Sequence, residues 1–180
     1  FVTKSKNFSI NASGDWVKVS TGTRSNLKLD FTTDSLGKMM DAMGFVGMVQ
    51  NGKTKASMNA SWPGSPGAMS LANLDGNLKV EVGEGRLLDV EPGGSGRILG
   101  LISLAEIPRR LTLDFSDFFS KGFSFNTMKG DIVFANGLAN TKNLHINGPA
   151  AEINISGTAD VRKQEYDQRI EVLPKAGGIL

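Results

Sequence analysis

Alternation of apolar and polar residues runs through most of this chain and constrains its fold more than any other feature. Successive side chains of a β-strand point to opposite faces, so a period of two predicts strands with one apolar and one polar face. Such strands are typical of antiparallel sheets, and we therefore predict a mainly β fold. The apolar positions of the alternating runs include Phe8 and Ile10; Val17 and Val19; Leu27, Leu29 and Phe31; Leu78, Val80 and Val82; Leu111, Leu113 and Phe115; Phe123 and Phe125; Ile132 and Phe134; Leu144 and Ile146; Ile153 and Ile155; Ile170 and Val172.

Asn-Gly and Asp-Gly pairs mark turns or bulges between these strands. Glycine adopts positive φ without a steric penalty, and Asn and Asp tolerate it better than other residues. The pairs are Asn51-Gly52, Asp75-Gly76, Asn136-Gly137 and Asn147-Gly148.

A weak internal repeat places Gly76, Gly130 and Gly157 in similar surroundings. Each glycine has an apolar residue two positions before it and apolar residues two and four positions after it. This spacing indicates hairpin-like units stacked into a sheet that is elongated in one direction. A plain meander of hairpins, in which such spacings coincide, is the alternative interpretation.

Helical patterns interrupt the strands at two places, with a single turn predicted at a third. Residues 35–43 predict an amphipathic helix capped by Asp34 or Ser35 and ended by Gly44. Residues 96–107 predict a helix that is apolar around most of its circumference. It would be about 18 Å long, too short to span a bilayer. A single helical turn is predicted over residues 116–120.

Composition excludes several classes of function. Lys and Arg number 20 against 18 Asp and Glu, and these charges are scattered, which disfavours a nucleic-acid partner. Cysteine is absent and His145 is the only histidine, so Ser-His-Asp, Cys-His and zinc arrangements lack parts. We therefore expect no enzyme, no cofactor and no metal. The chain starts at Phe1, and we interpret residues 1–180 as a single domain cut from a longer protein.

The segment between residues 85 and 125 holds the remaining candidates for a binding site. Glycines at 93, 94 and 96 precede Arg97 and a helix start, a geometry that can hold a phosphate. A tight turn followed by a helix cap is the simpler interpretation. The pair Arg109-Arg110 is either a solvated strand start or a contact for an anionic head group or an acidic partner.

The order of motifs in this chain resembles one family of bacterial envelope proteins. The matching segments are 62–64 (WPG), 74–78 (LDGNL), 85–93 (GRLLDVEPG), 96–104 (GRILGLISL), 108–115 (PRRLTLDF), 121–125 (KGFSF) and 148–151 (GPAA). Together they resemble the C-terminal region of the AsmA-like proteins of Gram-negative bacteria, of the YhdP type, which are relatives of TamB. Asn126 stands where that pattern has Asp.

The resemblance implies a fold and a role beyond what composition indicates. It implies a long, twisted antiparallel sheet folded into an open, taco-like apolar groove in the periplasm, within a protein anchored in the inner membrane. Phospholipid moving between the inner and outer membranes would be its cargo, without catalysis. The residues expected to line the groove are Leu78, Val80, Val82, Leu113, Phe123, Phe125, Ile132, Phe134, Leu144, Ile146, Ile153 and Ile155.

Two alternatives stand beside this interpretation. The first is a structural or docking module that caps such a bridge and contacts a membrane or an envelope protein through the 96–107 helix. Its contact residues would be Arg97, Ile98, Leu101, Ile102, Arg109 and Arg110. The second is a carbohydrate-binding β-sandwich, whose aromatic platform would have to come from Trp16, Trp62 or Tyr166. The alternation is equally compatible with apolar faces that close on each other and faces that hold a lipid.

Overall fold

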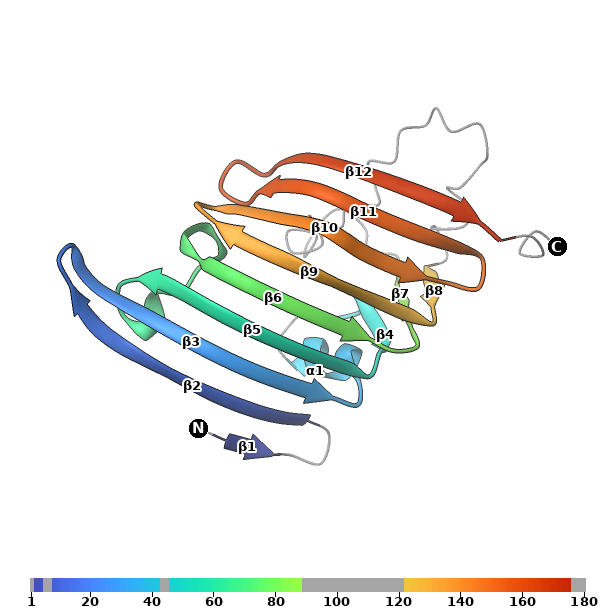
Figure 1. Ribbon diagram of the computed structural model, residues 1–180. Coiled ribbons are helices and arrows are strands. Elements are labelled where there is room, and N and C mark those ends of the chain that lie inside the picture. The colour runs from blue at the N-terminus through green and yellow to red at the C-terminus, as the bar shows by residue number, and fades with distance from the viewer. Residues whose placement is uncertain (1, 5–7, 43–45, 89–121, 176–180) are drawn as a thin grey trace.

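An antiparallel sheet of nine strands forms the body of the structure, a computed structural model that describes residues 2–4, 8–42, 46–88 and 122–175 (Figure 1). Its spatial order is β1-β2-β3-β5-β6-β9-β10-β11-β12, so β1 and β12 are its edges. This confirms the predicted mainly β, antiparallel fold with few helices. The strands are β1 (Val2–Lys4), β2 (Phe8–Val19), β3 (Gly22–Thr33), β5 (Thr54–Pro63), β6 (Asp75–Val82), β9 (Thr127–Ala135), β10 (Leu138–Asn147), β11 (Ala151–Asp160) and β12 (Glu165–Pro174).

Strand register collects the apolar residues on one face of this sheet. Leu29 is opposite Met58, Met58 is opposite Leu78, and Leu78 is opposite Ile132. Directly opposed residues of antiparallel strands share a face, so these four side chains form a continuous apolar row. We call this side of the sheet the inner face and the opposite, polar side the outer face.

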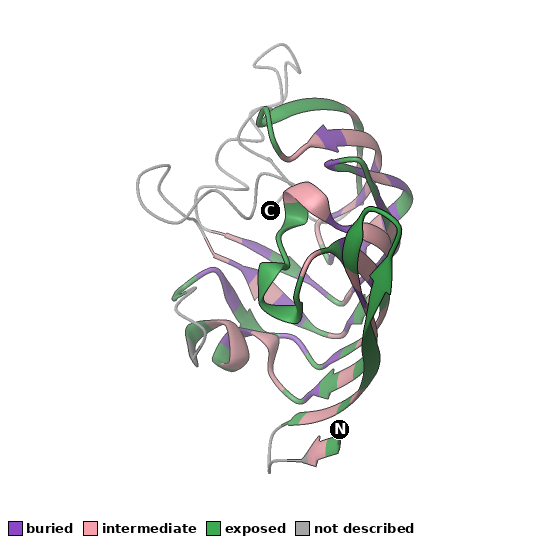
Figure 2. Ribbon diagram, turned by 90° about the vertical axis from the view of Figure 1, so that its left-hand side faces the viewer, coloured by how far each residue is buried: buried purple, intermediate pink, exposed green. Residues whose placement is uncertain are grey.

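A second, smaller layer covers part of the inner face (Figure 2). It consists of α1 (Leu36–Ala42) and a three-stranded sheet of β4 (Val49–Asn51), β7 (Gly85–Leu87) and β8 (Phe123–Phe125). The side chains between the two layers form the first core cluster. It comprises Met48, Val49, Val82, Leu87, Phe123, Phe125, Met128, Leu144, Ile146, Ala151, Ile153 and Ile155.

A second core cluster lies where two short 3₁₀ helices connect β5 to β6. These helices are η1 (Pro66–Ala68) and η2 (Leu71–Asn73). The buried members of the cluster are Ala60, Trp62, Leu74, Phe134 and Ala139. None of the helices in the described ranges is both long and apolar enough to cross a bilayer.

The first predicted helix is confirmed, and its cap is Ser35. The backbone N–H of Lys38 donates to Ser35 Oγ at 3.3 Å, and α1 begins at the next residue, Leu36. The predicted strand around Phe123 and Phe125 is also confirmed, as β8. Gly44, the predicted helices at 96–107 and 116–120, and the predicted strand at 111–115 lie outside the described residues.

The end of β2 differs from the sequence prediction. Alternation placed Val17 and Val19 on an apolar face, yet both lie on the outer face with 41% and 36% of their surface exposed. The reason is that β2 pairs with β3 without a bulge from Phe8 to Val19. One register therefore holds for the whole strand, and Phe8 and Ile10 set it.

Two of the predicted turn pairs adopt the expected positive φ, and one pair lies inside a strand. Asn136 and Gly137, with φ of 53° and 76°, form the two-residue connection between β9 and β10. Asn51 and Gly52 have φ of 62° and 82°. Asp75 instead begins β6, and Gly76 pairs with Ala60 within the sheet.

The turn between β11 and β12 is closed by hydrogen bonds to the carboxylate of Asp160. The backbone N–H groups of Lys163 and Arg162 donate to it and hold the pKa of this carboxyl below its ordinary value.

We predict that Gly76→Ala lowers the free energy of unfolding by about 1–3 kcal/mol. Gly76 has a φ of 150°, and a Cβ atom there would lie 2.1 Å from the carbonyl oxygen of Asn59. Urea denaturation measures the change. Gly67→Ala is the matched control, because a Cβ at Gly67 meets no atom within 4 Å. Equal stability of the two variants would contradict this account of Gly76.

Candidate functional site

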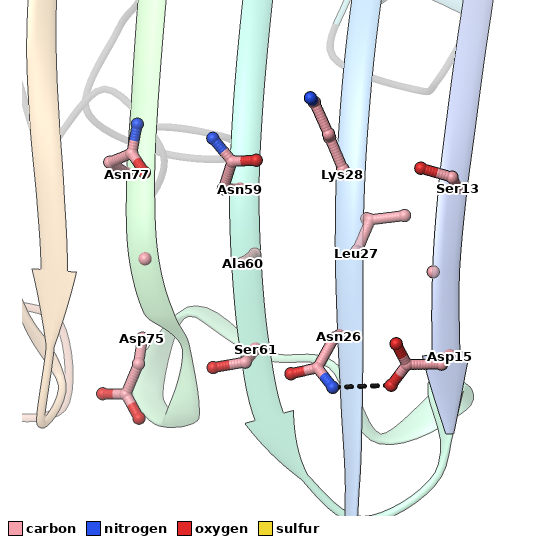
Figure 3. Close-up of a pocket in the computed structure, with 12 residues that line it drawn as sticks. Ser13, Asp15, Asn26, Leu27, Lys28, Asn59, Ala60, Ser61, Asp75 and Asn77 are labelled. Carbon is pink, nitrogen blue, oxygen red and sulfur yellow. Dashed lines mark hydrogen bonds between the residues drawn. The ribbon is translucent and has the colours of Figure 1, made fainter. Parts of the chain in front are cut away.

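The outer face carries a shallow depression of about 670 Å³ across β2, β3, β5 and β6 (Figure 3). Two rows of polar side chains flank it, and a third row of residues from the same four strands lies between them. The flanking rows are Ser13, Lys28, Asn59 and Asn77, and Asp15, Asn26, Ser61 and Asp75. The row between them is Gly14, Leu27, Ala60 and Gly76.

The two carboxylates of the depression, Asp15 and Asp75, both accept hydrogen bonds from neighbouring side chains. Asn26 Nδ2 donates to Asp15 Oδ1 at 2.6 Å, and Arg24 Nη2 donates to Asp75 Oδ2 at 3.0 Å and to Ser61 Oγ at 2.7 Å. No cluster of acidic or histidine side chains suited to a metal ion occurs in the part of the chain that the structure describes. Polar side chains flank the depression and it contains no aromatic side chain, so it is not suited to stacking on a sugar ring.

The three aromatic residues that were predicted to form a platform for a sugar do not lie together. Trp62 is 4% exposed and belongs to the second core cluster. Trp16 and Tyr166 occupy inner-face positions at opposite sides of the nine-stranded sheet, on β2 and β12. The three rings therefore do not form one surface, which disfavours the carbohydrate-binding interpretation.

Most residues predicted to line a groove lie together in the filled part of the inner face. Phe123 and Phe125 come from β8 and pack against residues of the large sheet. Leu113 and the predicted contact residues at 97–110 lie outside the described residues. The role of this set in binding lipid stays a prediction. Its buried members are Val82, Phe123, Phe125, Phe134, Leu144, Ile146, Ile153 and Ile155, and its half-buried members are Leu78, Val80 and Ile132.

The inner face is least covered on β2 and β3, near the β1 edge of the sheet. Here the apolar side chains are half-buried or exposed, and Phe8 has 37% of its surface exposed. The register joins them row by row to buried and half-buried residues of β5, β6 and β9. We call this set the open strip; it comprises Phe8, Ile10, Ala12, Leu27, Leu29 and Phe31.

Sequence reasoning recognised most of the open strip as strand residues but did not assign it to the site. The alternation around Leu29 is the same as that around Ile153, which is fully buried. The difference between them is the second layer, which packs on Ile153 and leaves Leu29 half-buried. Alternation along one strand carries no signal for that difference.

Fold and site together define an antiparallel β-protein with an apolar face that, within the described residues, is filled beneath the small sheet and least covered on β2 and β3. The chain belongs to the YhdP family, because the YhdP protein family model matches residues 2–180. This confirms the family indicated by the motifs. Over 166 residues the chain is 22% identical to the Intermembrane phospholipid transporter YhdP of Escherichia coli (strain K12). The match covers 92% of this chain but only 13% of that relative. No solved structure matches the chain.

Proposed function

We propose that this chain is a non-enzymatic segment of an envelope protein that transfers phospholipid between membranes. Its part in transfer is to hold acyl chains against the apolar inner face. The family and the name of the E. coli relative support the cargo. The observation that carries the proposal is the continuous row of half-buried apolar residues that runs across the inner face from Ile132 through Leu78 and Met58 to Leu29 near the β1 edge.

The energetics explain why a sheet without catalytic residues is sufficient. Exposing one CH₂ group to water costs about 0.8 kcal/mol, so moving a 16-carbon chain through water costs on the order of 10 kcal/mol. An apolar face that stays in contact with the chain removes most of this barrier. A face of this kind gives no direction to the movement, which must come from a lipid gradient or from an energised partner.

The two parts of the inner face suit different roles in a bridge. We propose that the open strip contacts lipid, together with half-buried Leu78 and Val80. We also propose that the first core cluster closes the groove beneath the small sheet. Among the described strands β1 has a neighbour on one side only, so its other side offers backbone hydrogen-bonding groups to which further strands of a longer protein can add. In this arrangement residues 1–180 form one terminal domain of a periplasmic bridge anchored in the inner membrane.

The filled core also supports a second candidate, a docking module that caps the bridge. Residues beneath the small sheet, such as Ile146 and Ile153, are 0% exposed and leave no space for a ligand. In this account the 96–107 segment, with Arg109 and Arg110, contacts a membrane or an envelope protein. Leu101→Asp would then disturb localisation in the envelope more than lipid capture. Unchanged localisation would contradict it.

The experiment for the main proposal is lipid analysis of the purified chain. We expect phospholipid to co-purify with it after expression in a Gram-negative host, detected by native mass spectrometry and by organic extraction. Asp30→Ala, which alters only an exposed outer-face residue, should retain the same lipid. A chain that carries no phospholipid, and that takes none from added vesicles, would contradict the proposal.

A further inference from the structure

Within the described strands, one charged side chain occupies the inner face. Among the paired inner-face positions of the described strands, the side chains are apolar, Gly, Ser, Thr or Gln, with the single exception of Lys18. Lys18 is opposite Thr23 at the end of β2. It therefore lies at the rim of the apolar face rather than within it.

The Lys18 ammonium group is available to a ligand. Its side chain is exposed, and no hydrogen bond or ion pair to it occurs within the described ranges. Arg24 lies nearby on β3 but on the outer face, where Asp75 and Ser61 accept its hydrogen bonds. The two neighbouring cations thus differ: Arg24 is engaged in holding strands together, and Lys18 is not.

Trp16 lies two residues before Lys18. It differs from Trp62 as Lys18 differs from Arg24: the side chain of Trp62 makes a hydrogen bond within the protein, and that of Trp16 is exposed. Both indoles share one row of the inner face, with Ser25 between them. Trp62 is 4% exposed, and its Nε1–H donates to the carbonyl oxygen of Ser65 at 2.9 Å. Trp16 is 58% exposed, and its Nε1–H has no acceptor in the described part of the molecule. An indole with an apolar ring and a free donor suits a boundary between apolar and polar surroundings.

We propose that Lys18 and Trp16 bind the phosphate of a lipid head group at the rim while the acyl chains lie on the open strip. This inference rests on the proposed function. An ammonium and an indole N–H are both donors, and an anionic phosphate oxygen accepts from both.

Dimensions agree with this arrangement. The hydrocarbon core of a bilayer is about 30 Å thick, so one acyl chain reaches about 15 Å. Along a strand about 15 Å corresponds to four or five residues. A head group held between Trp16 and Lys18 therefore places the chains over Ala12 of the open strip, and over Leu27 and Leu29, which lie opposite Gly14 and Ala12 on β3.

The test compares two lipids that differ only in the head group. Phosphatidylglycerol and diacylglycerol with identical acyl chains are offered in vesicles to the full chain, and captured lipid is quantified by mass spectrometry. We expect Lys18→Ala to lower phosphatidylglycerol capture about threefold and Lys18→Glu to lower it further, because exposed ion pairs are individually weak. Capture of diacylglycerol should not change. Lys28→Glu, the same charge reversal on the outer face, is the matched control.

Each outcome of this comparison decides between the site and the function on which it rests. Equal phosphatidylglycerol capture by Lys18→Glu and Lys28→Glu would overturn the head-group site and leave lipid binding intact. Failure of the unaltered chain to capture either lipid would overturn the proposed function itself. Displacement of the lipid by free glycerol phosphate would show a site for a soluble phosphate and would also overturn the inference.

Tryptophan fluorescence gives a second measurement that does not depend on capture. Trp16 is exposed and Trp62 is buried, so binding of phosphatidylglycerol should shift the emission of Trp16 to shorter wavelength. The shift should disappear in Trp16→Phe. A shift that persists in Trp16→Phe would contradict the placement of the head group beside this indole.

Discussion

Leu29→Asp is expected to lower phospholipid capture at least tenfold while the chain remains folded. Leu29 lies in the middle of the open strip, opposite Ala12 and Met58. An acyl chain resting there would desolvate the new carboxylate without offering it a partner, which costs several kcal/mol. Since 1.4 kcal/mol corresponds to a tenfold change in affinity, the loss should be large. The side chain is half-buried and not in the core, so the free energy of unfolding should fall by only about 1 kcal/mol.

Lipid capture by mass spectrometry and urea denaturation together measure this prediction. Lys28→Asp is the matched control, because it adds the same side chain one residue away on the outer face. It should capture lipid as the unaltered chain does. Undiminished capture by Leu29→Asp, or an equal loss in Lys28→Asp, would show that the open strip is not the lipid-binding surface.

Phe125→Ala is expected to lower the free energy of unfolding by about 3–5 kcal/mol, the largest stability effect that we predict. Phe125 is 1% exposed and joins the small sheet to the large one within the first core cluster. Its ring packs so closely on β7 that a Cβ at Gly85 would lie 2.8 Å from Phe125 Cζ. Removing the ring leaves a cavity between two layers that cannot easily close on it.

Phe8→Ala removes the same atoms from the open strip and is the control for this effect. Because 37% of Phe8 is already exposed, its loss should cost no more than about 1 kcal/mol. Urea denaturation curves of the two variants give the comparison. Equal stabilities would mean that the space beneath β8 is not filled by the protein, and the division between a closed and an open part of the inner face would be wrong.

The sequence predicts most of the long strands, because each of these has a period of two that its own residues determine. It missed β5, where the alternation is carried largely by the small residues Ala56 and Ala60. The helix at Ser35 was equally predictable, from a capping residue followed by an apolar stripe. Alternation fails at Val17 and Val19, because pairing with β3 fixes the register and places both side chains on the outer face, where they are exposed. It also could not show that Gly76 lies within a strand, because a close approach by β5 depends on tertiary structure.

The division of the inner face was not predictable in the same way. It depends on β4, β7 and β8, which have three residues each and are too short to show a period. They come from separate parts of the chain and meet only in the folded molecule. Lys18 was hidden for a related reason: between Val17 and Val19 it reads as an outer-face residue, and only the register of the whole of β2 places it on the inner face.

Photo-crosslinking from two adjacent residues of β3 tests the central claim most directly. A photoreactive amino acid is placed at Leu29 or at Asp30, and crosslinked lipid is sought in living cells. The two positions share the same strand but face opposite sides of the sheet. If the inner face holds phospholipid, position 29 will capture it and position 30 will not. Equal capture at both positions, or none at position 29, would contradict the claim.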